Sequence, residues 1–192
     1  PPSDNLCSGP RVIPGDPGAY EIIMGAIGAT PDFTMACGFN AGHTVWFQVT
    51  PTSSGLVTVS TCTPGTTYDT VVQIWKSTGD CEFPQRLDDL CADDTAEPTC
   101  TNACGPRGTE MSFFAMGGTT YLIQVGSYDS NSAGCTLCLD LLVSICGGDA
   151  TPPPASLACS GDLRYGGDDA GAVVEDCWPD NGCSGGACVP AC

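Results

Sequence analysis

Positive charge is scarce in this chain. Its 192 residues include 5 Lys and Arg against 22 Asp and Glu, which gives a formal net charge of −17. Because nucleic-acid binding depends on clustered Lys and Arg that neutralise phosphates, the composition argues against a nucleic-acid partner. The excess of acid has two explanations: high solubility, or the binding of a divalent cation by clustered Asp side chains.

Signals for a membrane span and for catalysis are also lacking. The chain has no apolar run of 18 residues, so we expect no membrane span. His43 is the single histidine, and no Gly-x-Ser-x-Gly nucleophile motif occurs. A Ser–His–Asp or Cys–His mechanism would have to use His43, which opens an expected strand and is better explained as a strand-end residue. We therefore expect a protein that is not an enzyme.

Cysteine, in contrast, is abundant. The chain has 15 Cys, together with 25 Gly and 16 Pro. Thiols at this density are typical of disulfide-linked proteins in oxidising compartments, which predicts a secreted or cell-surface protein. The chain starts at Pro1 without a signal peptide, as we expect if targeting has been removed. Because 15 is odd, at least one cysteine has no disulfide partner within the chain, so a free thiol and a bond to another chain are both open.

Short segments rich in β-branched and aromatic residues alternate with turn residues along the chain. In one of them, Val45, Phe47 and Val49 share a face and Trp46 points to the other. Residues 1–19 contain five prolines and are expected to be irregular. About eight short strands at this spacing indicate an all-β protein, an antiparallel β-sandwich with jelly-roll-like topology. The expected strands are 20–24, 43–50, 56–61, 68–75, 110–116, 119–126 and 135–145, with 86–90 as a weaker one.

The composition divides the chain into three parts. Residues 1–146 are expected to form the sandwich, and the Pro-rich residues 147–156 form an extended linker. Residues 157–192 have few large apolar side chains and five cysteines, which predicts a small tail stapled by disulfides. Trp46 and Trp75 lie in expected strands and are predicted to be core residues. Trp178, in the tail, is the better candidate for an exposed aromatic binding residue.

An ordered set of short motifs spans residues 4–146. The set comprises Val45-Trp46-Phe47, Gly55 to Cys62, Tyr68-Asp69-Thr70-Val71, Cys91-Ala92-Asp93-Asp94 and Gly118 to Val125. This set resembles the bacterial pre-peptidase C-terminal domain. The resemblance implies a secreted jelly-roll β-sandwich that serves as an accessory module of extracellular proteins and is not itself a catalyst. The tail after residue 147 has no counterpart in the motif.

The same resemblance implies a calcium site, because some collagen-binding relatives bind calcium. It points to Asp93 and Asp94 as ligands, with Asp69 and Asp4 nearby. The family often has Asn before the Asp pair, where this chain has Ala92. Hard oxygen ligands on a loop are what Ca²⁺ requires. The alternative is a solvated acidic loop without an ion.

Two pairs of neighbouring carboxylates could instead suggest a glycosidase. These are Asp88-Asp89 and Asp93-Asp94. Adjacent residues in an extended chain point to opposite faces, so a pair in sequence is not a pair in space. We therefore do not expect these residues to be catalytic.

Two functions remain from the sequence. The first is a structural protein that assembles with copies of itself into a filament or surface layer, through addition of a strand to a neighbour's sheet edge, through an intermolecular disulfide, or through both. The second is a calcium-assisted module that binds a polysaccharide or an extracellular matrix protein. The first is favoured because the loops show no convergent polar site.

Overall fold

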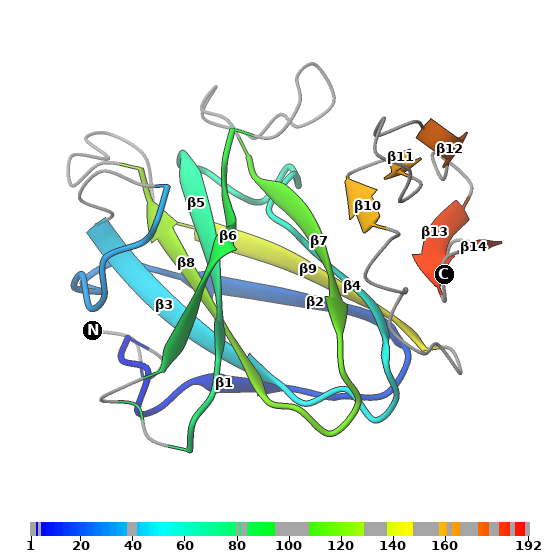
Figure 1. Cartoon of the computed structure of the whole chain (residues 1–192). Helices are drawn as coiled ribbons and strands as arrows, with labels where there is room; N and C mark the ends of the chain where they lie inside the picture. Colours follow the sequence, from blue (N-terminus) through cyan, green and yellow to red (C-terminus); the bar gives the residue numbers. More distant parts are fainter. Residues whose placement is uncertain are drawn as a thin grey trace.

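Two β-sheets face each other in the computed structural model of the chain (Figure 1). The structure describes residue 3 and residues 5–37, 42–79, 81, 84–94, 108–128 and 138–147 with their side chains, and the backbone of five short strands between residues 158 and 190. None of these residues forms a helix that is long and apolar enough to cross a membrane.

Nine strands build the two facing sheets. They are β1 (Arg11–Ile13), β2 (Gly18–Gly25), β3 (Gly42–Val49), β4 (Gly55–Ser60), β5 (Thr70–Lys76), β6 (Gln85–Asp93), β7 (Glu110–Ala115), β8 (Tyr121–Ser127) and β9 (Cys138–Gly147). The remaining strands are β10 (Ala158–Ser160), β11 (Leu163–Tyr165), β12 (Val173–Asp176), β13 (Asn181–Ser184) and β14 (Ala187–Pro190), which form one three-stranded and one two-stranded antiparallel sheet.

The order of strands β2 to β9 is that of a jelly roll. One sheet has the order β2-β9-β4-β7, and the other has β3-β8-β5-β6 with β1 added beside β3. From β2 to β9, every successive connection crosses between the sheets except the one from β5 to β6. All pairs are antiparallel apart from β1 with β3. The predicted all-β fold, an antiparallel sandwich of jelly-roll type, is confirmed.

The main core fills the space between the two sheets, and it is built from alternate residues of each strand. On β3, Val45, Phe47 and Val49 are buried in it, as the alternation predicts. Strand β9 contributes every second residue in the same way. Its buried apolar positions are Leu139, Leu141, Val143 and Ile145.

A second buried layer lies on the outer face of the five-stranded sheet, under residues 29–37, which we call the strap. The Phe33 ring lies 5.9 Å from the Trp46 ring and 5.5 Å from the Trp75 ring, measured between centroids. Further along the strap, Met35 packs on Val71. Both tryptophans are buried, as predicted, but in this outer layer and not in the main core.

The side-chain amide of Gln73 joins the strap to both strands beneath it. Its Oε1 accepts a hydrogen bond from the Ala36 N–H at 2.9 Å. Its Nε2 donates to the Leu87 and Leu90 carbonyls at 2.8 and 3.0 Å. These carbonyls belong to a bulge, because Gln73 pairs with Cys91 whereas Trp75 pairs with Arg86, which leaves three extra residues on β6. The buried amide therefore hydrogen-bonds to backbone groups that have no partner in the strand ladder.

Two disulfides fasten the outer layer to the sheet. Cys37, at the end of the strap, is bonded to Cys91 on β6, and Cys7 is bonded to Cys81. Cys62 and Cys146 are also disulfide-bonded. Disulfides of this kind form in oxidising compartments, which agrees with the predicted extracellular or cell-surface location.

The structure corrects two details and leaves others as predictions. Residues 1–19 are not wholly irregular, because Arg11–Ile13 forms β1 between Pro10 and Pro14 and pairs with the edge of β3. The weak strand expected at 86–90 extends over Gln85–Asp93, because the bulge is part of it. Most of the linker 147–156 lies outside the described residues, as do the side chains of the tail, so the three-part division stays a prediction.

Replacing Gln73 with Ala should destabilise the fold. The Ala36 N–H and the Leu87 and Leu90 carbonyls would lose their partner, and each buried polar group left unpaired costs about 1–3 kcal/mol. We expect the free energy of unfolding to fall by about 3 kcal/mol in urea titrations. Gln85→Ala, on the exposed start of β6, should change it by less than about 0.5 kcal/mol. Equal effects of the two substitutions would contradict this role for the buried amide.

Candidate metal centre

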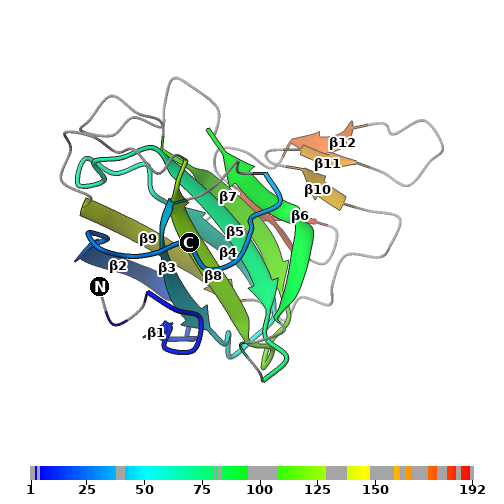
Figure 2. The same ribbon diagram turned by 90° about the vertical axis from the view of Figure 1, so that its left-hand side faces the viewer.

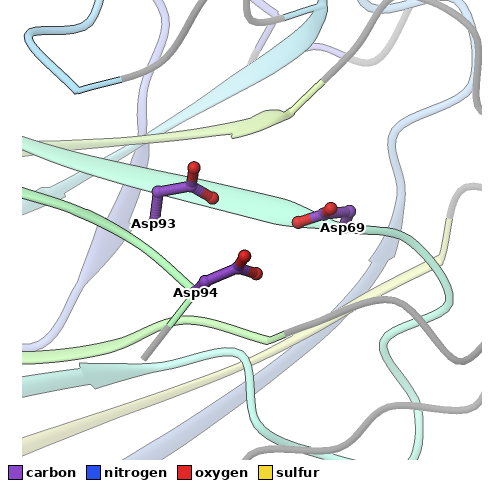
Figure 3. A group of neighbouring side chains, drawn as sticks. All are labelled: Asp69, Asp93 and Asp94. Atoms are coloured by element: carbon purple, nitrogen blue, oxygen red, sulfur yellow. The ribbon is translucent and has the colours of Figure 1, made fainter. Parts of the chain in front are cut away.

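Three carboxylates converge at one end of the five-stranded sheet. Asp69, Asp93 and Asp94 each present one carboxylate oxygen, and these oxygens all lie within 4.8 Å of one another (Figure 3). Asp69 and Asp93 are half-buried, and Asp94 is exposed. The sequence predicted these three residues as cation ligands, and the structure brings all three together. We call them the aspartate cluster.

The pairing of β5 with β6 places the first two carboxylates. Asp69 comes directly before β5, and Asp93 ends β6 opposite Val71. Because side chains on one face of a strand recur every second residue, Asp69 lies on the same face as Val71, which is also the face of its partner Asp93. Two different segments thus deliver carboxylates to one spot.

A backbone turn places the third carboxylate. Asp94 has φ 51°, in the left-handed region that Asp tolerates better than most residues. In a regular strand the side chains of Asp93 and Asp94 would point to opposite faces, as the sequence analysis assumed. The turn ends the strand at Asp93 and brings the Asp94 carboxylate to the same side, so that assumption is wrong for this pair.

The end of β6, which carries Asp93, is fixed by a disulfide and by apolar packing. Cys91 lies two residues before Asp93 and is bonded to Cys37 of the strap. Cys91 and Cys37 pack with buried Met35 and Val71. The end of β6 is therefore fixed by a covalent bond and by apolar packing directly beside the cluster.

A network of buried hydroxyl groups fixes the start of β5, next to Asp69. The Thr61 and Thr70 hydroxyls are 2.6 Å apart, and the Thr109 N–H donates to the Thr61 hydroxyl at 2.8 Å. The Thr109 hydroxyl in turn donates to the Thr70 carbonyl. The carbonyl of Asp69 itself accepts a hydrogen bond from the Tyr128 N–H at 3.0 Å. The backbone at Asp69 is thus fixed from several directions.

Tyr68 anchors the same segment in the main core. Its side chain is buried there. Burial, and to a smaller extent the nearby Cys138 thiol, raises the pKa of the phenol well above its ordinary value of 10. Tyr68 therefore stays neutral across the physiological pH range and contributes no negative charge beside Asp69.

The cluster suits a hard cation. Its donors are all carboxylate oxygens, the ligand type preferred by Ca²⁺, Mg²⁺ and Mn²⁺, whereas Zn²⁺ and copper favour His or Cys. The Nδ1 atom of His43 lies 3.1 Å from the Ala29 carbonyl, so this ring contacts the strap and is not part of the cluster. Three carboxylates supply between three and six oxygens, so backbone carbonyls or water would complete the six to eight that Ca²⁺ takes.

The cluster does not lie in the hollow that the structure describes. A cavity of about 300 Å³ lies near the Cys7–Cys81 disulfide and is also lined by Gln48, Ser77 and Leu122. No carboxylate lines it. The lining of this cavity therefore contributes no carboxylate to a candidate site.

The other residues considered from the sequence do not join the cluster. Asp88 forms a salt bridge with Arg86, and Asp89 is exposed on β6. Asp4 and Trp178 lie outside the described residues. Asp88 and Asp89 lie in the bulge of β6, between the residues that pair with Trp75 and Gln73, whereas the cluster lies at the end of the strand.

Comparison with known proteins adds little. No protein-family model and no curated protein matches the chain. Among solved structures, it is similar to CorA, a surface-associated copper-binding protein important in copper acquisition by Methylomicrobium album BG8. The identity is 11%, the TM-score is 0.38, and the match covers 72% of this chain and 99% of that one. A likeness this distant assigns neither a ligand nor a function. The resemblance to the pre-peptidase C-terminal domain stays a prediction.

Neutralising one carboxylate should stabilise the cation-free protein. Two unit charges about 4.8 Å apart repel by about 1 kcal/mol in water and by more near a protein surface. Asp94→Asn keeps a residue that accepts the left-handed backbone, so we expect the free energy of unfolding in EDTA to rise by about 1 kcal/mol. The gain should shrink between 20 mM and 1 M NaCl because salt screens exposed charges. A gain independent of salt would show that backbone preference, and not repulsion, is responsible.

Proposed function

We propose that this chain is a secreted, non-catalytic module that binds Ca²⁺ through Asp69, Asp93 and Asp94. The observation that carries the proposal is the convergence of three carboxylate oxygens within 4.8 Å from two segments that are separate in the sequence. An ion between them would replace mutual repulsion by attraction. It would also fasten the start of β5 to the end of β6.

The extracellular setting supports Ca²⁺ over other hard cations. Extracellular modules bind Ca²⁺ with dissociation constants of about 10⁻⁴–10⁻³ M, which needs fewer charged ligands than a cytosolic sensor. Mg²⁺ demands near-ideal octahedral geometry and keeps several of its waters. Three carboxylates, one of them exposed at a strand end, suit the more flexible coordination of Ca²⁺.

The module's partner is a polysaccharide or an extracellular matrix protein. The proposed cation site lies at a sheet end, where β5 begins and β6 ends (Figure 3). An ion there would order the surface that a partner meets, without taking part in chemistry. Trp178 stays the candidate aromatic contact in the tail.

Calcium should raise the melting temperature of the EDTA-treated protein. A ligand at 100 times its dissociation constant stabilises the folded state by about 2.7 kcal/mol, which for a chain of this size is on the order of 5–10 °C. Asp93→Asn should reduce the shift to less than half because it removes a ligand charge. Differential scanning calorimetry across a CaCl₂ series measures both effects.

The matched control is Asp89→Asn, which removes the same charge from an exposed position on β6. Its Ca²⁺-dependent shift should equal that of the unsubstituted protein. The proposal is wrong if 10 mM Ca²⁺ leaves the melting temperature unchanged. It is also wrong if Asp93→Asn and Asp89→Asn respond to Ca²⁺ alike, because the ion would then bind elsewhere.

Self-assembly into a filament or surface layer stays a prediction. If assembly uses an intermolecular disulfide, Cys138 is the candidate residue, because it is the free cysteine among the described residues. Cys138 begins β9 opposite Gly25 and is half-buried. The second strand from the sheet edge is therefore where an intermolecular bond would start.

Cys138→Ser tests this form directly. If an intermolecular disulfide joins the native chains through Cys138, the substitution should abolish the dimer band on non-reducing gels and leave the monomer folded. If the native protein is instead a monomer with a free thiol, thiol titration in denaturant should lose one equivalent per chain. A disulfide-linked dimer that survives Cys138→Ser would contradict the assignment.

A further inference from the structure

We propose that β2 is a pairing edge, along which a second copy of this chain adds its own β2 in antiparallel orientation. The two four-stranded sheets would then join into one sheet of eight strands. This inference specifies one edge and one partner for strand addition, and it does not depend on the cation site.

Four strands lie at the edges of the two sheets, and three of them are poor templates. β1 has three residues and follows Pro10. β6 carries an Arg86–Asp88 ion pair and exposed Asp89, and charges of this kind block pairing with another chain. β7 has six residues, begins with Glu110, and lies beside β6 (Figure 1).

β2 is the exception among these edges. It has eight residues and one charged side chain, Glu21, and within the described part of the chain it pairs with β9 alone (Figure 2). No described strand pairs with its other side, whose N–H and C=O groups another extended strand would satisfy. A long edge with so little charge is what natural proteins avoid unless the edge is used.

The side chains of β2 are incompletely covered. Ile23, on the outer face, is 68% exposed. Tyr20, Ile22 and Met24 point inward and pack against the main core, yet they are only half-buried. The inward residues of the neighbouring strand β9 are fully buried. A further strand beside β2 would bury the open flank of all four apolar side chains.

Antiparallel pairing of β2 with itself has a favourable register. With the two-fold axis at Ile22, this residue faces the partner's Ile22, and Tyr20 faces the partner's Met24. Glu21 then faces the partner's Ile23, so the like charges are not placed opposite each other, where they would be destabilising. Because the same edge is used by both copies, the assembly closes as a dimer.

The dimer should be weak and should depend on salt. One added strand pair buries less surface than the roughly 1,200–2,000 Å² of a stable interface, so dissociation on dilution is expected. Each copy carries a formal charge of −17. Salt screens the repulsion between the copies, so raising NaCl from 20 to 300 mM should favour the dimer.

The test uses the full chain with Cys138→Ser, which excludes disulfide-linked dimers through that thiol. Sedimentation equilibrium over a concentration series should show a monomer–dimer equilibrium. Ile23→Glu should raise the dissociation constant at least tenfold, because it places a negative charge opposite the partner's Glu21, and like charges directly opposite each other are destabilising. Val12→Glu is the matched control, since Val12 is 70% exposed on β1, and it should leave the constant unchanged.

A cross-linking variant tests the register. Ile22→Cys places two thiols opposite each other at the two-fold axis, where Cβ atoms lie about 4.5–5.5 Å apart and mild oxidation can bridge them. Ile23→Cys shifts the thiols to diagonal positions about 7–8 Å apart and should bridge poorly. Fast cross-linking by Ile22→Cys alone supports the proposed register.

Several results would overturn the proposal. They are a monomer at every concentration, equal effects of Ile23→Glu and Val12→Glu, equal cross-linking of the two cysteine variants, or an open series of higher oligomers. The calcium-induced thermal shift of Ile23→Glu should match that of the unsubstituted protein. Loss of pairing with calcium binding intact, or the reverse, therefore separates failure of this inference from failure of the cation site.

Discussion

The buried amide of Gln73 is the interaction on which the rest of this structure depends. It satisfies the carbonyls of the β6 bulge and the Ala36 N–H of the strap at once. The bulge adds three residues to β6, and an odd shift exchanges the two faces of a strand. The bulge therefore determines the face of β6 on which Asp93 lies. The bulge is tolerated in a buried layer because the Gln73 amide hydrogen-bonds to carbonyls that the strand ladder leaves unpaired.

The strap and the disulfides act at the same end of the sheet. The Cys37–Cys91 bond joins residues 54 apart in the sequence and lies two residues from Asp93. Closing a loop of that length restricts the unfolded chain and stabilises the fold by about 4 kcal/mol in the chain-entropy model. The carboxylates that repel one another thus sit where the chain is tied most firmly, between a disulfide and a network of buried threonine hydroxyls. That fastening holds the three carboxylates close together, which is the arrangement that the proposed Ca²⁺ site requires.

Alternation of side chains predicted much of the sandwich, and it failed where the backbone departs from a regular strand. Val45, Phe47 and Val49 face the core as a period of two requires. The strap was not predictable, because Gln73 stands in a run of β-branched residues that indicates an ordinary buried strand, and nothing local shows that its amide has backbone partners 14 to 37 residues away. The residues of the aspartate cluster were predicted from the family resemblance and from the ligand preferences of Ca²⁺. The rule that adjacent side chains diverge argued against the Asp93–Asp94 pair, and it failed because of one left-handed residue.

The distribution of acid over the sheet edges links fold and function. Acidic side chains gather on β6, where Asp88 and Asp89 protect an edge and Asp93 enters the cation cluster. β2, at the edge of the other sheet, has Glu21 as its one charge. In a chain of net charge −17, a second copy would meet less local repulsion at β2 than at β6. A divalent cation held by the cluster would cancel two further negative charges per copy, at a place well separated from the edge in the strand order. In the two proposals made for this chain, charge directs a cation to one sheet and a neighbouring strand to the other.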